Sequence, residues 1–106
     1  MMQERDREIL EQFAARVRAV FPSAHIWAFG SRTRGDAHPD SDLDVCVVLD
    51  RLDADIRGTI SDIAWEVGFE HDLLIFTVAF STEMFERGPA SASSLVRTIL
   101  EEGVAA

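Results

Sequence analysis

Residues 25–49, HIWAFGSRTRGDAHPDSDLDVCVVL, decide the fold of this 106-residue chain. His25–Phe29 is aromatic, apolar or β-branched and stops at a glycine, which predicts a strand. The polar segment Ser31–Ser41 contains glycine and proline and predicts a loop with room for one helical turn. Leu43–Leu49 is apolar on both faces beyond Asp44 and predicts a second, buried strand.

The sequence on either side of this stretch predicts three helices. Apolar residues recur at helical spacing from about Gln3 to Val20, with charges between them. A second apolar stripe runs from Leu52 to Val67, and we expect Gly68 to end it. A last short helix covers Leu95–Leu100 and closes at Gly103. Three serines are available as its N-cap: Ser91, Ser93 and Ser94.

The longest apolar run, from His71 to Phe80, predicts a third strand that is entered through Asp72. Ser81–Pro89 is then a connection with room for a short turn. The expected order is α-β-loop-β-α-β-α over a single domain, residues 1–106. This order predicts a small mixed α/β (α+β) fold, in which a short mixed sheet of about three strands packs against helices.

The net charge of −9 limits the classes of partner. Acidic residues outnumber basic ones 19 to 10, whereas a protein that holds nucleic acid by its phosphates needs a positive surface. We therefore expect a small nucleotide or a basic protein partner, and no direct contact with nucleic acid. No apolar run reaches the roughly 20 residues of a membrane span, and the N-terminus is too charged for a signal peptide. With a single cysteine, Cys46, the cytoplasm is the expected compartment.

Asp42 and Asp44 are the first candidate site. Residues two apart on a strand point to the same face, so both carboxylates project together. Two adjacent negative charges repel unless a cation lies between them, and Mg²⁺ prefers carboxylate and phosphate oxygens. Alone, an Asp-x-Asp pattern is more often an acidic turn, and it also occurs in metal-dependent glycosyltransferases.

Gly30 and Ser31 follow the first predicted strand directly and are the second candidate site. A glycine lets backbone approach a ligand closely, and a turn there exposes N–H donors to phosphate oxygens. Neither a Walker loop nor a dinucleotide-binding glycine pattern is present. Alone, Gly-Ser after a strand is most simply a turn that ends the strand.

The combined order of these features, strand, Gly-Ser, Arg-Gly, Ser-Asp-x-Asp, strand, is far more specific. It resembles the G-S-x-x-R-G…S-D-x-D signature of the polymerase-β-like nucleotidyltransferase superfamily, and the short chain points to its minimal nucleotidyltransferase (MNT) branch. The match is close over Gly30–Asp44, and the predicted order of helices and strands agrees with that of the family over most of the chain. The residues that carry the match are Gly30, Ser31, Arg34, Gly35, Ser41, Asp42 and Asp44. The family often has alanine where Thr33 stands here.

The resemblance implies roles for these residues. Gly30 and Ser31 would hold the β- and γ-phosphates of a nucleoside triphosphate, expected to be ATP. Asp42 and Asp44 would bind two Mg²⁺ ions. The family uses a third acidic residue on a later strand, for which we expect Asp72 as metal ligand and catalytic residue.

Three assignments remain open at this stage. Glu70 is the rival of Asp72 as the third carboxylate. Arg34, expected in the nucleotide site together with Ser41, would either neutralise phosphate charge or brace the loop through Asp36 or Asp40. Arg32 is a further candidate for phosphate neutralisation.

The resemblance also implies a function. Small MNT proteins often act as type VII-like antitoxins that bind a HEPN-domain RNase toxin, and some transfer AMP from ATP to a tyrosine of that toxin. The implied assembly is a hetero-oligomer, and this chain contains no tyrosine of its own. A non-catalytic antitoxin that acts by contact and a small adenylyltransferase for aminoglycoside-like molecules are the alternatives.

The remaining conspicuous side chains have simpler interpretations. His25, His38 and His71 are irregularly spaced and predict no zinc site. Trp27 and Trp65 lie within apolar patterns and are expected in the core, although either could stack on a base.

Overall fold

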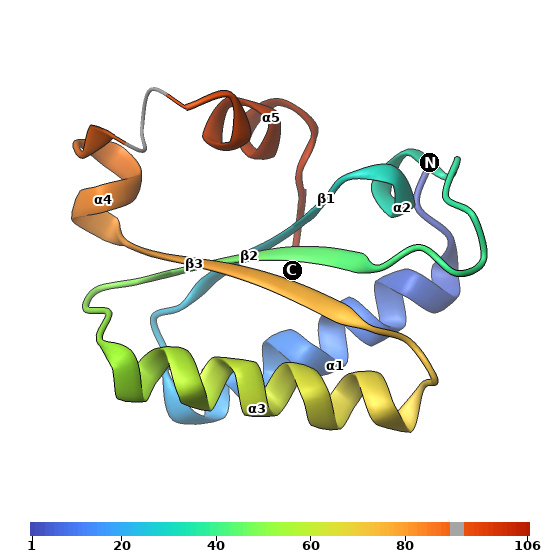
Figure 1. Ribbon diagram of the computed structural model, residues 1–106, viewed down its shortest axis with the longest axis horizontal. Helices are drawn as coiled ribbons and strands as arrows, with labels where there is room; N and C mark the ends of the chain where they lie inside the picture. Colours follow the sequence, from blue (N-terminus) through green and yellow to red (C-terminus); the bar gives the residue numbers. More distant parts are fainter. Residues whose placement is uncertain (90–92) are drawn as a thin grey trace.

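The computed structural model describes residues 1–89 and 93–106 and shows one mixed sheet with helices on both faces (Figure 1). Within these residues the sheet has four strands in the order β3-β2-β1-β4. The strands are β1 (His25–Phe29), β2 (Leu43–Leu49), β3 (Ile75–Ser81) and β4 (Val104–Ala105). One face is covered by α1 (Glu4–Val20) and α3 (Ala54–Glu70), and the other by α4 (Thr82–Glu86) and α5 (Ser94–Glu102). The mixed α/β fold predicted from the sequence is confirmed.

Strand pairing places the ends of three strands beside one another. β1 and β2 are antiparallel and are joined by the loop that contains α2 (Ser31–Arg34). β2 and β3 are parallel, and α3 supplies the crossover that a parallel pair requires. In this register Asp44 lies between Phe29 on β1 and Phe76 on β3.

The two faces of β2 belong to different apolar clusters. Alternate residues Leu43, Val45 and Val47 are buried in the main core against α1 and α3. Cys46 and Val48 point the other way, into a smaller cluster with residues of α4 and α5. Because side chains alternate along a strand, Asp44 lies on the same face as this smaller cluster.

Most of the predicted elements are confirmed. The bounds of β1 and β2 agree with the sequence expectation, and the expected helical turn after β1 is α2. α5 ends at Glu102 and is capped by Gly103, the residue predicted to close it. Its cap is Ser93, whose hydroxyl accepts a hydrogen bond from the Val96 N–H over 3.2 Å; Ser91 lies outside the described residues.

The third strand begins later than predicted, because α3 continues past Gly68 to Glu70. Gly68 is needed inside the helix, since any Cβ there would collide with the Leu73 carbonyl of the returning chain. The Leu73 N–H donates to the Gly68 carbonyl over 2.9 Å. Asp72 takes the left-handed position after the helix, with φ 54°. Residues 71–74, predicted to be the start of the strand, therefore form the turn between α3 and β3.

The sequence analysis missed β4 and misplaced one tryptophan. β4 pairs with Trp27 and Ala28 of β1, and its two residues are too short for any periodic signal. Trp65 is 65% exposed on α3 and is not a core residue, whereas Trp27 packs on the smaller cluster and stacks on Phe85. Among the described residues, none of the helices has both the length and the apolar character to cross a membrane.

Candidate active site

Asp42 and Asp44 lie at the start of β2, as predicted. Asp42 directly precedes the strand, Asp44 is its second residue, and both are partly exposed. Burial, and after it the negative charge of Asp42, raises the pKa of Asp44 above its ordinary value. The carboxylates thus repel one another in a partly desolvated position, which is the setting that a divalent cation relieves.

Gly30 brings the Gly-Ser pair into contact with this carboxylate pair. It follows β1 with φ 83° and ψ −162°, a conformation open essentially to glycine alone. A Cβ on Gly30 would lie 2.5 Å from the Asp44 Oδ2 atom. The backbone at Gly30 and the carboxylate of Asp44 therefore form one site, although they are 14 residues apart in the sequence.

Thr33 secures the turn that follows Gly30. Its hydroxyl donates to the Gly30 carbonyl over 2.6 Å, and its N–H donates to the same oxygen over 3.1 Å. An alanine at this position would make only the second of these bonds. The threonine at this position is therefore a stabilising variation of the motif.

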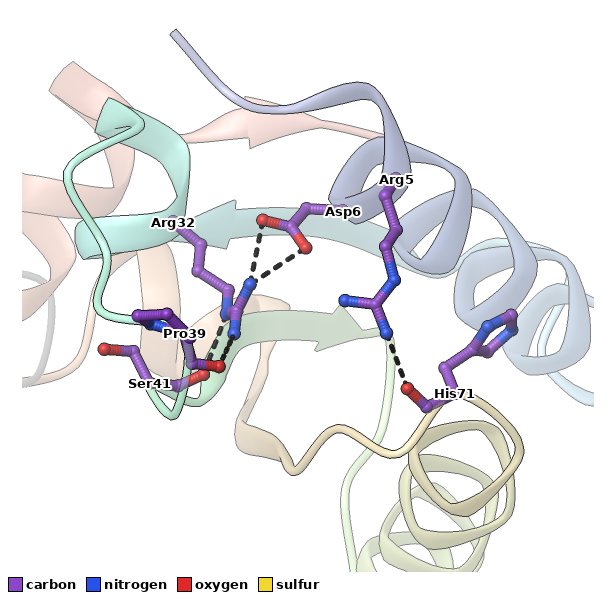
Figure 2. Close-up of polar contacts among 6 residues, drawn as sticks. All are labelled: Arg5, Asp6, Arg32, Pro39, Ser41 and His71. Carbon is purple, nitrogen blue, oxygen red and sulfur yellow. Dashed lines mark hydrogen bonds and ion pairs between the residues drawn. The ribbon is translucent and has the colours of Figure 1, made fainter.

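Arg32 is buried, with 7% of its surface exposed, and it braces the loop that leads to Asp42 (Figure 2). Its Nη1 donates to both carboxylate oxygens of Asp6 on α1, at 3.0 and 3.1 Å. Its Nε donates to the Ser41 carbonyl over 2.8 Å and its Nη2 to the Pro39 carbonyl over 3.0 Å. Because its guanidinium is committed to these four oxygens, the suggestion that Arg32 neutralises phosphate is wrong.

Asp6 is the partner that the sequence analysis missed. It is 3% exposed, and it lies four residues before Leu10, in line with the apolar stripe of α1 that includes Phe13. An acidic residue on an apolar stripe was the available signal, because a buried charge requires a partner. Its pairing with Arg32, 26 residues away, could not be read from spacing.

Arg34 is half-exposed on the outer side of α2. Its Nε lies 3.4 Å from the Asp36 carboxylate, and its Nη1 lies 3.6 Å from that of Glu102 on α5. The bracing contact through Asp36 is therefore formed, while the described contacts of Asp40 are with His38. The phosphate-binding role of Arg34 stays a prediction.

The structure does not bring Asp72 to the carboxylate pair. Asp72 lies in the turn before β3 and lines a groove with α3 residues that include Trp65 and Phe69. The β3 residue beside Asp44 is Phe76. In the described part of the chain, no group of three or more His, Cys, Asp or Glu side chains is placed to hold a metal ion. In this structure β3 begins three residues after Asp72, and the role of Asp72 as a third metal ligand stays a prediction.

Glu70, the rival third carboxylate, is engaged elsewhere. Arg16 donates to both of its carboxylate oxygens at 2.8 and 2.9 Å, and Gln12 donates at 3.1 Å. The hydrogen bond from Arg16 is the main cause that lowers the pKa of Glu70. Glu70 therefore joins α3 to α1, as does neighbouring His71, whose carbonyl accepts from Arg5 over 2.7 Å (Figure 2).

The sequence of residues 7–106 matches the profile of the nucleotidyltransferase domain family. The chain belongs to this family. A comparison of this nucleotidyltransferase domain with curated protein sequences finds no match.

Three toxin–antitoxin crystal structures contain chains with a similar fold. A mutant MntA–HpeT complex matches with 21% identity and a TM-score of 0.61, over 94% of this chain and 70% of that one. A toxin–antitoxin structure with AMP-PNP matches with 23% identity and a TM-score of 0.60, over 90% and 70%. The tri-AMPylated HEPN toxin of Shewanella oneidensis with its MNT antitoxin matches with 19% identity and a TM-score of 0.58, over 94% and 70%. At these identities the likeness shows a shared fold.

Proposed function

We propose that this nucleotidyltransferase domain transfers AMP from Mg²⁺-ATP to a tyrosine hydroxyl of a HEPN-type toxin and so acts as its antitoxin. The observation that carries the proposal is the direct approach of Gly30 to Asp44, with Asp42 beside it. This arrangement puts backbone suited to phosphate against a repelling carboxylate pair suited to a cation. Nucleotidyl transfer needs both in one place.

Asp42 and Asp44 are the residues proposed to hold Mg²⁺. The fit rests on their chemistry: they are two neighbouring carboxylates, and burial, followed by the negative charge of Asp42, raises the pKa of Asp44. Mg²⁺ is commonly bound by one or two carboxylates together with substrate phosphates and water. When bound, it would neutralise charge on the phosphates during transfer. Both proposed Mg²⁺ ions would draw on these carboxylates together with phosphate oxygens and water.

The other residues of the site are proposed to bind and orient the triphosphate. Gly30 and Ser31 would hold the β- and γ-phosphates, with Arg34 and Ser41 at the edge of the same site. The acceptor oxygen forms a bond to the α-phosphorus while the bond to the bridging oxygen breaks. Pyrophosphate leaves, and the acceptor proton passes to solvent. Arg32 takes part indirectly, because it fixes the loop just before Asp42.

Two observations support a protein acceptor. The chain has a net charge of −9, which would attract a basic protein. A fold relative was crystallised with an AMPylated HEPN toxin, and another with AMP-PNP. A hetero-oligomer of this domain with its target is the proposed assembly.

Neutralisation by contact, without transfer, is a second candidate. The observation in its favour is the apolar residue Phe76 next to Asp44, where a third carboxylate would have to stand to join the pair.

The experiment that separates the candidates uses the domain, its co-expressed HEPN-type toxin and Mg²⁺-ATP. Intact-protein mass spectrometry of the toxin should show one or more added AMP groups, and fragmentation should locate them on tyrosine. The matched control is the double variant Asp42→Asn and Asp44→Asn, which should add none. If wild type and the double variant both neutralise the toxin and neither adds mass to it, the result would favour the contact mechanism.

A further inference from the structure

An exposed apolar side chain, that of Phe76, stands beside Asp44, while exposed Leu74 lines the groove that also holds Asp72. Phe76 pairs with Asp44 in the parallel β2–β3 register, so both side chains project from the same face of the sheet. Phe76 is 52% exposed and Leu74, two residues earlier, is 51% exposed. The Leu74 carbonyl accepts a hydrogen bond from Leu43, the residue between the two aspartates, over 2.9 Å.

The order of the strands places Phe76 on the side of Asp44 that faces away from Gly30. Gly30 ends β1, Asp44 lies on the middle strand β2, and Phe76 lies on β3. With the β- and γ-phosphates at Gly30, pyrophosphate departs on the β1 side. In an in-line displacement the attacking oxygen approaches opposite the leaving group, so it approaches from the β3 side.

We propose that Phe76 forms the acceptor-binding surface of the site, on which the aromatic ring of the acceptor packs. This inference rests on the proposed function and adds a residue and a direction of approach to it. An exposed phenylalanine offers its face or edge to a second ring at little ordering cost. The acceptor ring therefore packs on Phe76 while its oxygen reaches the α-phosphorus at Asp44.

The chemistry of the acceptor fits the same residue. Phe76 cannot take a proton, and the third carboxylate that would act as a base from β3 is absent from its place beside Asp44. A phenol, with a pKa of about 10, gives up its proton far more readily than water does. The oxygen–phosphorus bond then forms, the bridging bond breaks, and the proton leaves to solvent. An acceptor phenol that packs on Phe76 and loses its proton readily therefore does not need a carboxylate base on β3.

The test measures steady-state AMP transfer to the HEPN-type toxin and, separately, the affinity for Mg²⁺-ATP. Phe76→Ala should raise the KM for the toxin roughly tenfold, the effect of about 1.4 kcal/mol of lost contact, with the Kd for Mg²⁺-ATP unchanged within about threefold. Phe76→Leu should recover part of the loss. The control is Leu100→Ala: Leu100 is exposed on α5 near Asp50, at the opposite end of β2, and should leave both constants unchanged.

The outcomes are distinguishable. If wild type transfers AMP but Phe76→Ala keeps its KM for the toxin, the inference is wrong and the proposed function stands. If the Kd for Mg²⁺-ATP rises in Phe76→Ala by more than about threefold, the nucleobase occupies Phe76 and the acceptor assignment is overturned. If wild type transfers nothing, the proposed function fails and the inference fails with it. Thermal melting of each variant checks the fold, which half-exposed Phe76 should not disturb.

Discussion

Replacing Asp6 by alanine removes one half of the buried ion pair that braces the loop ahead of Asp42. The guanidinium of Arg32, a buried residue in the wild-type structure, then keeps only the Ser41 and Pro39 carbonyls as described acceptors. Removing one partner of a buried pair costs about 3–5 kcal/mol. Because two bonds to Arg32 remain, we expect the lower end, about 3 kcal/mol.

This loss is large for a domain of this size. An unfolding entropy of about 2.1 cal/mol/K per residue over 106 residues converts 1 kcal/mol into a shift of about 4–5 °C in Tm. Asp6→Ala should therefore melt about 13 °C below wild type. Chemical denaturation should give a matching fall in the free energy of unfolding, with an unchanged slope.

A double variant tests whether the charge is responsible. Asp6→Leu with Arg32→Met replaces the pair by apolar side chains and should be more stable than Asp6→Ala, because no charge is left buried alone. Its transfer rate should still be low, since the Ser41 and Pro39 carbonyls have lost their donors. As a control, Glu102→Gln removes a half-exposed partner of Arg34 and should change stability by less than about 1 kcal/mol. A Tm for Asp6→Ala within about 3 °C of wild type would refute the reasoning.

Three further predictions concern single contacts. Gly30→Ala should destabilise the fold by about 1–3 kcal/mol, because alanine is strained at φ 83° and its Cβ would clash with Asp44. AMP transfer should fall by more than the folded fraction does. A fall in transfer that only matches the fall in folded fraction would contradict a site shared by Gly30 and Asp44. Thr33→Ala should cost about 1 kcal/mol through the lost bond to the Gly30 carbonyl, whereas Thr33→Ser should melt near wild type; equal melting of all three proteins would count against that bond. Because the Arg16 hydrogen bond lowers the pKa of Glu70, its contribution is complete above the ordinary pKa of 4.5 and is lost as pH falls through the lowered value. The Tm difference between wild type and Glu70→Gln should therefore be present at neutral pH and shrink as the pH falls through the lowered pKa of Glu70. A difference that does not depend on pH would argue against the pairing.

Local signals in the sequence were sufficient for the centre of the fold. β1 ends before Gly30, where the backbone adopts a conformation that requires glycine. In the sequence this appears as a glycine directly after an apolar run. β2 is apolar on both faces because both are covered by helices. The carboxylate pair follows from the period of the strand. Each of these features depends on residues close in sequence.

The parts that failed depend on contacts between distant residues. Gly68 looked like a helix end, but its missing side chain makes room for the Leu73 carbonyl inside the turn. Because α3 continues to Glu70 and a turn follows it, Asp72 lies before β3 and Phe76 is the β3 residue beside Asp44. β4 is held by pairing with Trp27, about 80 residues away, and the ion pair of Asp6 spans α1 and α2. Sequence periodicity does not report such pairings.

The central claim is that Asp42, Asp44 and Gly30 form one Mg²⁺-dependent nucleotidyl transfer site. The most direct measurement is the transfer of label from α-labelled ATP to the co-purified HEPN-type toxin, with pyrophosphate release followed in parallel. We predict that label appears on the toxin with an equal amount of pyrophosphate, that removal of Mg²⁺ by a chelator stops both, and that Asp44→Asn stops both while it stays folded. Full transfer by Asp44→Asn, or transfer that continues without a divalent cation, would contradict the account.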